Sequence, residues 1–304
     1  MVSEKIAGIP SVEYMHPGHY ACKGCGAALA MRYALKAIGR KAVAVIPACC
    51  WSIIQAPFPF RDLDINIVNV AFEVTAAVVS GLVEGFEYQG KKDVVVFGWA
   101  GDGGTVDIGI QTLSGAVERN HNMLYIMYDN EAYENTGIQR SSATPIGAWT
   151  TTTPVGKTKM WKKEPKKNIV EILVAHNIPY AATATVAYPE DMIRKIQKAL
   201  TIKGPKFIHV LSPCQPGWRY PPEKMIEVSR LAVQTKAFPL YEVEYGKYRI
   251  TVKPRSFLPI VEYFKIQGRF KHLLAEEEMI KYIQEYVDRQ WELLLKKEEF
   301  TKSL

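Results

Sequence analysis

The chain has 304 residues, of which 48% are hydrophobic and 23% are charged, as is typical of a soluble globular protein with a sizeable core. Residues 1–17 contain no apolar segment of the secretory-signal type and no run of 18 apolar residues occurs, so we expect a cytoplasmic chain without a membrane span. The net charge of +7 is compatible with an acidic partner, but no nucleic-acid-binding motif accompanies it, so we expect no nucleic-acid partner.

An irregular leader, residues 1–20, precedes the first cysteines. Cys22 and Cys25 stand directly before a helical segment, Ala27–Ile38, which Gly39 ends. Because cytoplasmic chains rarely contain disulfides, the five cysteines of this chain indicate metal binding or catalysis. The spacing of Cys22 and Cys25 is found both in zinc half-sites and in redox dithiols, so a metal cluster would need further thiols.

A short predicted strand, Lys41–Ile46, leads to the next two cysteines, Cys49 and Cys50. Neighbouring residues of an extended chain point to opposite sides, so we expect only one of these two thiols to face a given site. A further strand, Ile65–Val70, and a helix rich in small residues, Glu73–Gly85, are predicted to follow.

The chain is organised around residues 94–137. The apolar, β-branched run Val94–Phe97 predicts a buried strand. Glycines then recur in the next few positions, at Gly98, Gly101, Gly103 and Gly104. Such a segment lets the backbone approach a ligand where a Cβ atom would collide. The single acid within it is Asp102.

A helix from about Asp107 to Arg119 and a strand from Met123 to Tyr128 come next, and Asn130 follows that strand. Strand, helix and strand in this order imply two parallel strands, so Asp102 and Asn130 should meet at the edge where open α/β sheets bind ligands. A carboxylate, an amide oxygen and backbone carbonyls suit an Mg²⁺ ion that also binds phosphate. The alternative is that the acid satisfies a turn and the amide ends a strand.

Residues 131–153 form a long polar segment that includes Asn135, and loops of this length are usually functional or disordered. A cluster of lysines comes next, consisting of Lys157, Lys159, Lys162, Lys163, Lys166 and Lys167. The simplest interpretation of this cluster is a solvated loop. The alternative is a basic surface that meets an acidic partner protein.

Residues 168–211 alternate between predicted helices and strands, and Cys214 follows the last strand, Phe207–Leu211. The isolated thiols and Asp102 therefore all come after strands, which places them at one edge of a parallel sheet with the loop of Cys22 and Cys25 folded over it. Four thiolates suit either Zn²⁺ or an iron–sulfur cluster, and the spacing leaves both open.

Beyond residue 216 the pattern changes. Tyr241–Val252 predicts a hairpin, and Glu276–Lys297 predicts an amphipathic helix. We therefore predict a doubly wound α/β fold with a mostly parallel sheet and a C-terminal hairpin-plus-helix extension, which packs on the domain or on a partner subunit. The expected parts are a leader (1–20), a ligand-binding domain (21–215) and the extension (216–304).

Two motifs resemble a known family. The GDG of residues 101–103, followed after a spacer of 26 residues by Asn130, resembles the motif shared by thiamine-diphosphate enzymes. The segment YDNEAYENTGIQRSSATP, residues 128–145, more closely resembles the β subunit of pyruvate:ferredoxin oxidoreductase and its 2-oxoacid:ferredoxin relatives. The resemblance covers roughly residues 16–240.

The resemblance implies a thiamine-diphosphate-binding fold and three cofactors: thiamine diphosphate, Mg²⁺ and a [4Fe–4S] cluster. Asp102, the Asn130 side chain and the Ala132 carbonyl would ligate Mg²⁺, and Asn135 would reach the substrate. The glycines that would lie against the diphosphate are Gly101, Gly103 and Gly104. The thiolates that would ligate the cluster are those of Cys22, Cys25, Cys50 and Cys214, with Cys50 also beside the thiamine and Cys49 a small buried side chain.

The resemblance also implies an activity, the oxidative decarboxylation of a 2-oxoacid with coenzyme A and ferredoxin, in either direction. Pyruvate, giving acetyl-CoA and CO₂, is the expected substrate, and the basic surface at the lysine cluster would meet ferredoxin. Only the diphosphate half of a two-domain thiamine site is visible here. We therefore expect a hetero-oligomer with subunits of α, γ and δ type, in which a partner supplies the glutamate that activates thiamine and this chain alone is inactive.

Other interpretations stay open. The same chemistry could act on 2-oxoisovalerate, 2-oxoglutarate or oxalate. A thiamine enzyme without redox chemistry, similar to acetolactate synthase, would contain no iron. A non-catalytic zinc- or nucleotide-binding scaffold would contain no thiamine.

Overall fold

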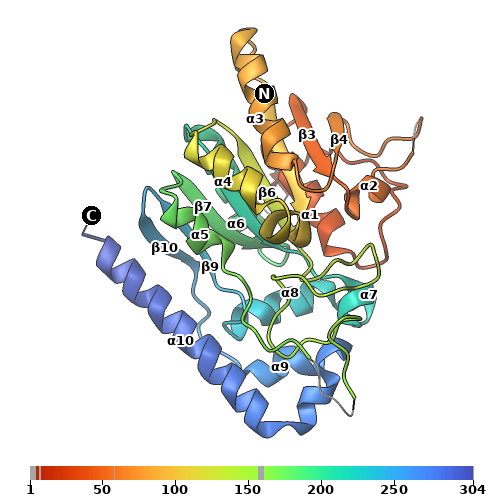
Figure 1. The fold of residues 1–304 in the computed structure, drawn as a ribbon, viewed down its shortest axis with the longest axis vertical. Helices are drawn as coiled ribbons and strands as arrows, with labels where there is room; N and C mark the ends of the chain where they lie inside the picture. Colours follow the sequence, from red (N-terminus) through yellow and green to blue (C-terminus); the bar gives the residue numbers. More distant parts are fainter. Residues whose placement is uncertain (1–4, 7, 58, 157–160, 304) are drawn as a thin grey trace.

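An eight-stranded sheet lies at the centre of the structure, a computed structural model that describes residues 5–6, 8–57, 59–156 and 161–303 (Figure 1). Among these residues the strand order is β10-β9-β7-β8-β6-β5-β3-β4. The strands are β3 (Ala42–Pro47), β4 (Asn66–Val70), β5 (Val95–Gly101), β6 (Leu124–Asp129), β7 (Tyr180–Thr185), β8 (Lys206–Leu211), β9 (Leu240–Glu244) and β10 (Lys247–Val252). A separate antiparallel pair is formed by β1 (Lys5–Ile6) and β2 (Ile9–Pro10).

The sheet is mostly parallel, as predicted. From β4 across to β7 each neighbouring pair of strands runs parallel, whereas the hairpin of β9 and β10 runs antiparallel. The central strands are buried along almost their whole length, which is the pattern of strands covered on both faces. The prediction of a doubly wound α/β fold is confirmed.

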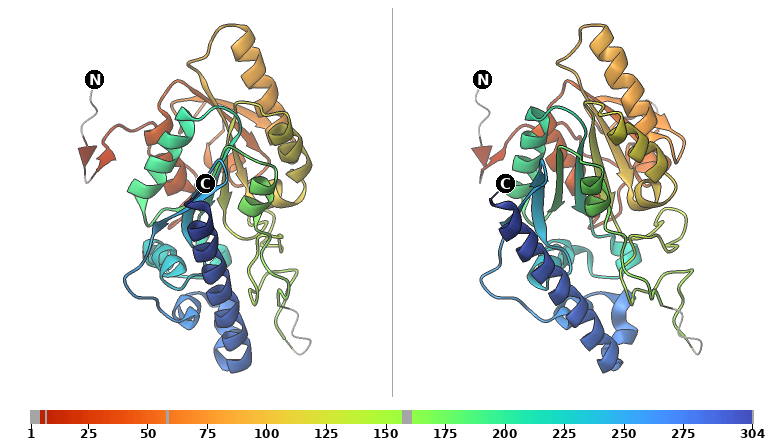
Figure 2. Two further views of the ribbon diagram at one scale, coloured as in Figure 1. Left: turned by 90° about the vertical axis from the view of Figure 1, so that its left-hand side faces the viewer. Right: turned by 60° about the vertical axis from the view of Figure 1, so that its left-hand side comes forward.

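Helices cover both faces of the sheet (Figure 2). On one face, α1 (Gly26–Ile38) and α6 (Pro189–Thr201) share an apolar core with the strands. On the other face, α3 (Thr75–Tyr88), α4 (Ile110–Glu118) and α5 (Ile169–Ala175) share a second core. α3, α4, α5 and α6 connect parallel strands, as predicted, whereas α1 precedes the first strand of the sheet.

The C-terminal part of the chain completes the sheet. The predicted hairpin is present, and β9 pairs with β7, so the sheet continues across the predicted boundary at residue 216. The predicted terminal helix is α10 (Glu277–Thr301), which lies along β10 (Figure 1). The shorter helical segments are α2 (Trp51–Ile54), η1 (Gly103–Asp107), α7 (Gln215–Trp218), η2 (Pro222–Lys224), α8 (Met225–Gln234), α9 (Ile260–Lys265) and η3 (Gly268–Ala275). No helix of the described residues is long and apolar enough to cross a membrane.

The carboxyl ends of the parallel strands meet at one edge of the sheet. The registers align the end of β5 with β6, Gly101 opposite Tyr128, and the end of β6 with β8, Asp129 opposite Leu211. The segments that leave this edge carry Asp102, Asn130 and the isolated cysteines. The topology therefore brings the candidate ligand-binding residues to the edge that the sequence predicts.

Candidate cofactor and metal site

A cavity of about 430 Å³ opens at the carboxyl ends of β5 and β6. Its lining brings together all the residues that the family resemblance assigns to thiamine diphosphate, Mg²⁺ and the substrate, namely Cys50, Gly101, Asp102, Gly103, Gly104, Asn130, Ala132 and Asn135. They come from the segments that follow β3, β5 and β6, so the parallel order of these strands creates the cavity.

Gly103 illustrates why the motif uses glycine. The Tyr133 ring lies directly over it, and a Cβ atom at residue 103 would be 2.2 Å from Tyr133 Cε1. The Tyr133 hydroxyl donates to Asp107 Oδ2 at 2.7 Å, which fixes the ring in this place. Any larger residue at 103 would displace Tyr133 from the wall of the cavity.

The side-chain amide of Asn130 lies between two oxygens. One end of the amide is 2.9 Å from Asp102 Oδ1 and 2.9 Å from the Ala132 carbonyl oxygen. If that end is the nitrogen, it donates to both oxygens; if it is the oxygen, three oxygens face one another. Neighbouring ligands of an octahedral Mg²⁺ ion lie about 2.8–3.0 Å apart, since each Mg–O distance is about 2.0–2.1 Å. The second orientation therefore fits one face of a magnesium octahedron.

Asp102 is a buried acid in a setting that favours a bound cation. Its side chain is almost fully buried, and Ser141 Oγ donates a hydrogen bond to Oδ2. Burial and the nearby Asp129 carboxylate raise the pKa of Asp102 well above its ordinary value. A divalent cation would compensate for the charge that burial disfavours, so the residues present fit the implied Mg²⁺ ion.

A buried ion network holds the residues on both sides of Asn130. His209 Nε2 lies 2.6 Å from Asp129 Oδ2, and Lys166 Nζ pairs with Asp129 and, at 2.8 Å, with Glu131. Arg269 Nη2 donates to Glu131 Oε2 at 2.6 Å. Burial alone would raise the pKa of Asp129, but Lys166 and His209 lower it to about 2. The network therefore keeps Asp129 charged and fixes both acids in place.

The backbone of the Asn130 loop is held as tightly as its side chains. Trp218 Nε1 donates to the Asn130 carbonyl at 2.7 Å, and the Arg269 guanidinium lies 3.7 Å from the centre of the Trp218 ring. Glu131 has a φ of 65°, a left-handed conformation that is unusual for a residue with a side chain. The surrounding bonds maintain this strained conformation, which orients the Ala132 carbonyl toward Asn130.

Another cavity, of about 200 Å³, lies beside the first and is lined by four thiols. These are the predicted cluster ligands Cys22, Cys25, Cys50 and Cys214. Cys49 lines the larger cavity instead, as expected if only one thiol of the adjacent pair faces the cluster. The predicted convergence of the thiols is therefore present in the structure.

Glycine also explains how the loop of Cys22 and Cys25 closes over the sheet edge. The Gly26 N–H donates to the Pro213 carbonyl at 3.0 Å, and a Cβ atom at residue 26 would be 2.7 Å from Pro213 N. The Tyr220 hydroxyl donates to the Gly24 carbonyl at 3.0 Å. These two bonds bring Cys25 next to the segment that carries Cys214.

Burial favours the protonated form of three of the four thiols that line this cavity. Burial raises the pKa of Cys25, Cys50 and Cys214, so metal binding must displace their protons. Within the described part of the chain, no three His, Cys, Asp or Glu side chains lie close enough together to hold a single metal ion.

Glu134 is a site residue that the sequence reasoning missed. Its carboxylate lines the larger cavity, and neither oxygen has a hydrogen-bond partner among the described residues. Burial raises the pKa of Glu134 to about 7. Gly217 makes room for it, because a Cβ atom there would be 2.1 Å from Glu134 Oε1. The available signal was an acid inside the YENTG motif, two residues after Ala132.

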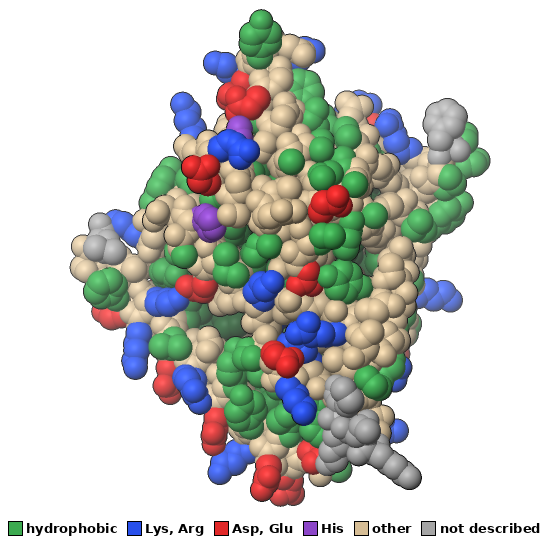
Figure 3. All heavy atoms as spheres, in the orientation of Figure 1, with side chains coloured by type: hydrophobic (Ala, Val, Ile, Leu, Met, Phe, Trp, Pro, Cys, Tyr) green, Lys and Arg blue, Asp and Glu red, His purple; other side chains and the backbone are tan. Residues whose placement is uncertain are grey.

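Neither the solvated loop nor the alternative basic surface describes most of the lysines of residues 157–167 that can be assessed, although Lys163 is exposed. Lys157 and Lys159 lie outside the described residues. Lys162 is buried, and Lys166 and Lys167 turn inward to the acids and carbonyls behind them. On the face shown in Figure 3, basic and acidic side chains are interspersed rather than segregated.

Comparison with known proteins identifies the family. The family described as "Thiamine pyrophosphate enzyme, C-terminal TPP binding domain" matches residues 61–210. The chain is 52% identical to the ketoisovalerate oxidoreductase subunit VorB of Pyrococcus furiosus, over 96% of both chains. It is 50% identical to the pyruvate synthase subunit PorB of Methanothermobacter marburgensis, over 92% of this chain and 96% of that one.

A solved structure shares the fold. It is a 2-oxoglutarate:ferredoxin oxidoreductase from Magnetococcus marinus, with a TM-score of 0.56 and 19% identity over 75% of this chain and 84% of that chain. The family resemblance inferred from the sequence is confirmed by the relatives above. The chain belongs to the family of thiamine-pyrophosphate-binding oxidoreductase subunits, PorB and VorB, of the 2-oxoacid:ferredoxin oxidoreductases.

Proposed function

We propose that this chain is the thiamine diphosphate-, Mg²⁺- and [4Fe–4S]-binding subunit of a 2-oxoacid:ferredoxin oxidoreductase that uses coenzyme A. The reaction is the reversible oxidative decarboxylation of a 2-oxoacid to an acyl-CoA and CO₂, with electrons passing to ferredoxin. The family supports the reaction class, and the two adjoining cavities support the cofactor assignment.

Asp102, Asn130 and Ala132 would hold Mg²⁺ through a carboxylate, an amide oxygen and a backbone carbonyl. The spacing of 2.9 Å from the Asn130 amide to each of the other two oxygens supports this assignment. The backbone N–H groups at the start of η1 follow Asp102 directly and would donate to the diphosphate. The glycines Gly101, Gly103 and Gly104 would let the diphosphate approach the backbone.

The four thiols would ligate a [4Fe–4S] cluster rather than zinc. A Zn²⁺ ion keeps its thiolates about 2.3 Å from its centre, which leaves no cavity between them. Here Cys22, Cys25, Cys50 and Cys214 surround a cavity of about 200 Å³. That spacing suits a polynuclear cluster, with each thiolate bound to a different iron.

The shared wall between the two cavities is the observation that carries the proposal. Cys50, Ile53, Asn130 and Asn135 line both of them. Asn130, a candidate Mg²⁺ ligand, and Cys50, a candidate cluster ligand, therefore lie in the same wall. Electrons released beside Asn130 would have only this wall to cross before reaching the cluster.

The remaining residues would bind, orient and exclude water. When bound, thiamine diphosphate supplies the electron sink on which decarboxylation of a 2-oxoacid depends. Asn135 lies where its amide would donate to the substrate carboxylate. Phe72 and Tyr133, whose ring centres are 5.9 Å apart, form an aromatic wall that would keep water from the reacting carbon.

Partner subunits would complete the site. The lining of the larger cavity comes from the diphosphate-binding half alone, and the relatives are named as subunits. We therefore propose partners of α, γ and δ type, one of which supplies the glutamate that activates thiamine, with ferredoxin as electron acceptor. The isolated chain would then show no turnover.

Two relatives from Pyrococcus furiosus bear on the substrate. The chain is 52% identical to the ketoisovalerate oxidoreductase subunit VorB and 45% identical to the pyruvate synthase subunit PorB of that organism. The prediction that pyruvate is the substrate stays untested. The higher identity to VorB than to PorB makes 2-oxoisovalerate a second candidate substrate. The two substrates share the 2-oxocarboxylate and differ in their apolar group, so a screen of rates separates them.

The test is anaerobic purification of the complex formed with its partner subunits. Thiamine, iron and sulfide are quantified, and viologen reduction is measured with pyruvate and with 2-oxoisovalerate in the presence of coenzyme A. We expect thiamine and iron on this subunit and CoA-dependent reduction with one or both acids. A complex without iron on this subunit would refute the cluster, and one without thiamine would refute the whole proposal.

A further inference from the structure

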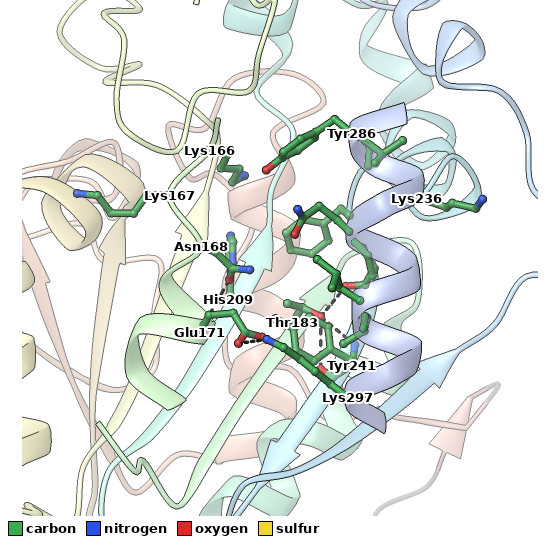
Figure 4. A pocket seen from close by; sticks show the side chains of 17 residues that line it. Lys166, Lys167, Asn168, Glu171, Thr183, His209, Lys236, Tyr241, Tyr286 and Lys297 are labelled. Carbon is green, nitrogen blue, oxygen red and sulfur yellow. Dashed lines mark hydrogen bonds and ion pairs between the residues drawn. The ribbon is translucent and has the colours of Figure 1, made fainter. Parts of the chain in front are cut away.

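A third cavity, of about 220 Å³, lies between α10 and the sheet, away from the cofactor cavities (Figure 4). Residues of β7, β8 and β9 line it on the sheet side, and residues of α10 close the other side. None of the candidate cofactor ligands named above is among its lining residues. It is therefore a separate space, built by the packing of the C-terminal helix on the sheet.

The walls of this cavity are largely apolar. Phe238, Tyr241, Val287 and Leu294 are all buried and contribute to its lining. Buried aromatic and aliphatic walls with a few convergent polar groups are typical of small-molecule sites.

The lining also contains polar groups, among them Lys166 and Tyr286. The Lys166 ammonium forms ion pairs with Asp129 and Glu131, which leaves one of its three N–H groups to donate to a further partner. Figure 4 shows that ammonium directed toward the hydroxyl of Tyr286, whereas Lys167 and Lys236 point away from the cavity.

Two polar side chains of α10 in the lining lack protein partners. The Tyr286 hydroxyl and the Gln290 amide, both on α10, have no hydrogen-bond partner among the described residues. The one acid in the lining, Glu171, is already engaged by Lys297 and by the Tyr248 hydroxyl. The Tyr286 hydroxyl and the Gln290 amide can each donate or accept, so with Lys166 the lining offers three donors to a ligand.

We propose that this cavity binds a small organic carboxylate with a short apolar body. Its carboxylate lies between the Lys166 ammonium, the Tyr286 hydroxyl and the Gln290 amide, which supply a charge-assisted hydrogen bond and two neutral ones. Its hydrocarbon part lies against Phe238 and Leu294. The site goes beyond the proposed function and does not depend on it, because it uses none of the candidate cofactor ligands.

The test is ligand binding to the purified complex by isothermal titration calorimetry. Isovalerate and phenylacetate are compared with their uncharged analogues, isovaleramide and phenylacetamide, and with inorganic phosphate. The test variant is the double substitution Tyr286→Phe and Gln290→Leu, which removes the two free donors while keeping the shape of the wall. Arg289→Gln, at an exposed position of the same helix, is the matched control.

We expect at least one of the two carboxylates to bind, and its amide and phosphate not to bind. The double variant weakens carboxylate binding roughly tenfold or more, whereas Arg289→Gln leaves it unchanged. Asn135→Ala also leaves it unchanged, which excludes binding where the substrate carboxylate would lie in the thiamine cavity. Absence of carboxylate binding, equal binding of amides or phosphate, or an affinity that the double variant does not alter would overturn the assignment.

Discussion

Arg269 and Glu131 are 138 residues apart in the sequence, yet Arg269 Nη2 donates to Glu131 Oε2 at 2.6 Å and both side chains are buried. Glu131 is the left-handed residue between Asn130 and Ala132, so this bond links the C-terminal part of the chain to the candidate magnesium loop. The C-terminal segment therefore supports the candidate cofactor site as well as extending the sheet.

Substitution of Arg269 tests this support. Arg269→Gln leaves Glu131 with Lys166 as its remaining cation, so we expect the left-handed turn to relax and the affinity for Mg²⁺–thiamine diphosphate to fall about tenfold or more. Lys271→Gln, at an exposed position of the same η3 segment, is the control. Affinity is measured by titrating the cofactor into the metal- and thiamine-free complex. Equal affinities for the two variants would contradict a supporting role for Arg269.

Asp102 provides a test that separates the two cofactor cavities. Asp102→Asn keeps an acceptor for Ser141 but removes the negative charge, so we expect purified complex to lose most of its thiamine and keep its iron. Thiamine is measured by fluorescence after oxidation to thiochrome, and iron is measured by a colorimetric assay. Retention of normal thiamine in the variant would rule out Asp102 as a magnesium ligand.

The adjacent residues Cys49 and Cys50 provide a matched pair of substitutions that tests the proposed cluster ligands. Cys214→Ser and Cys50→Ser remove thiols from the smaller cavity, so we expect both to lower the iron and sulfide of this subunit. Cys49→Ser changes a neighbouring thiol that lines the larger cavity, and we expect it to keep iron. Loss of iron in Cys49→Ser but not in Cys50→Ser would reverse the assignment of the pair.

The raised pKa of Glu134 predicts that the free energy of unfolding of the cofactor-free chain depends on pH. Burial raises the pKa of Glu134 to about 7, above its value in the unfolded chain, so the folded state binds the proton more tightly. The resulting stability is fully present below about pH 4.5 and is lost as the pH rises through 7. Glu134→Gln should therefore raise the free energy of unfolding at pH 8, by up to about 3 kcal/mol, and change it little at pH 4.5.

Urea denaturation of the isolated chain at the two pH values measures this difference. Glu285→Gln, at an exposed position of α10, is the control and should show no such pH dependence. A Glu134→Gln variant whose stability gain is equal at both pH values would show that the carboxylate is not charged and buried in the folded chain.

Much of the fold could be predicted from the sequence because its signals are local. Apolar runs such as Val94–Phe97 and Met123–Tyr128 mark buried strands, and the order of strand and helix fixes their parallel direction. That direction alone brings the segments after the strands to one edge. The meeting of Asp102 with Asn130, and of Cys50 with Cys214, follows from it, while their roles as ligands stay predictions.

The parts that could not be predicted depend on long-range contacts. The spacing of lysines in a sequence does not show which of them will pair with buried acids. The sequence therefore predicts a surface position for Lys166, whereas in the structure it pairs with Asp129 and Glu131. The pairing of β9 with β7 likewise depends on which sheet edge is free after the fold forms. Arg269 carries no local signal at all, because its partner lies in a distant loop.

The most direct test of the account is a crystal structure of the assembled complex with diffraction data collected at the iron absorption edge. The account predicts a strong anomalous peak in the cavity of Cys22, Cys25, Cys50 and Cys214, and a magnesium-bound diphosphate between Asp102 and Asn130 on the other side of the Cys50–Asn135 wall. An anomalous signal at the zinc edge in place of iron, or a diphosphate bound away from Asp102, would contradict it.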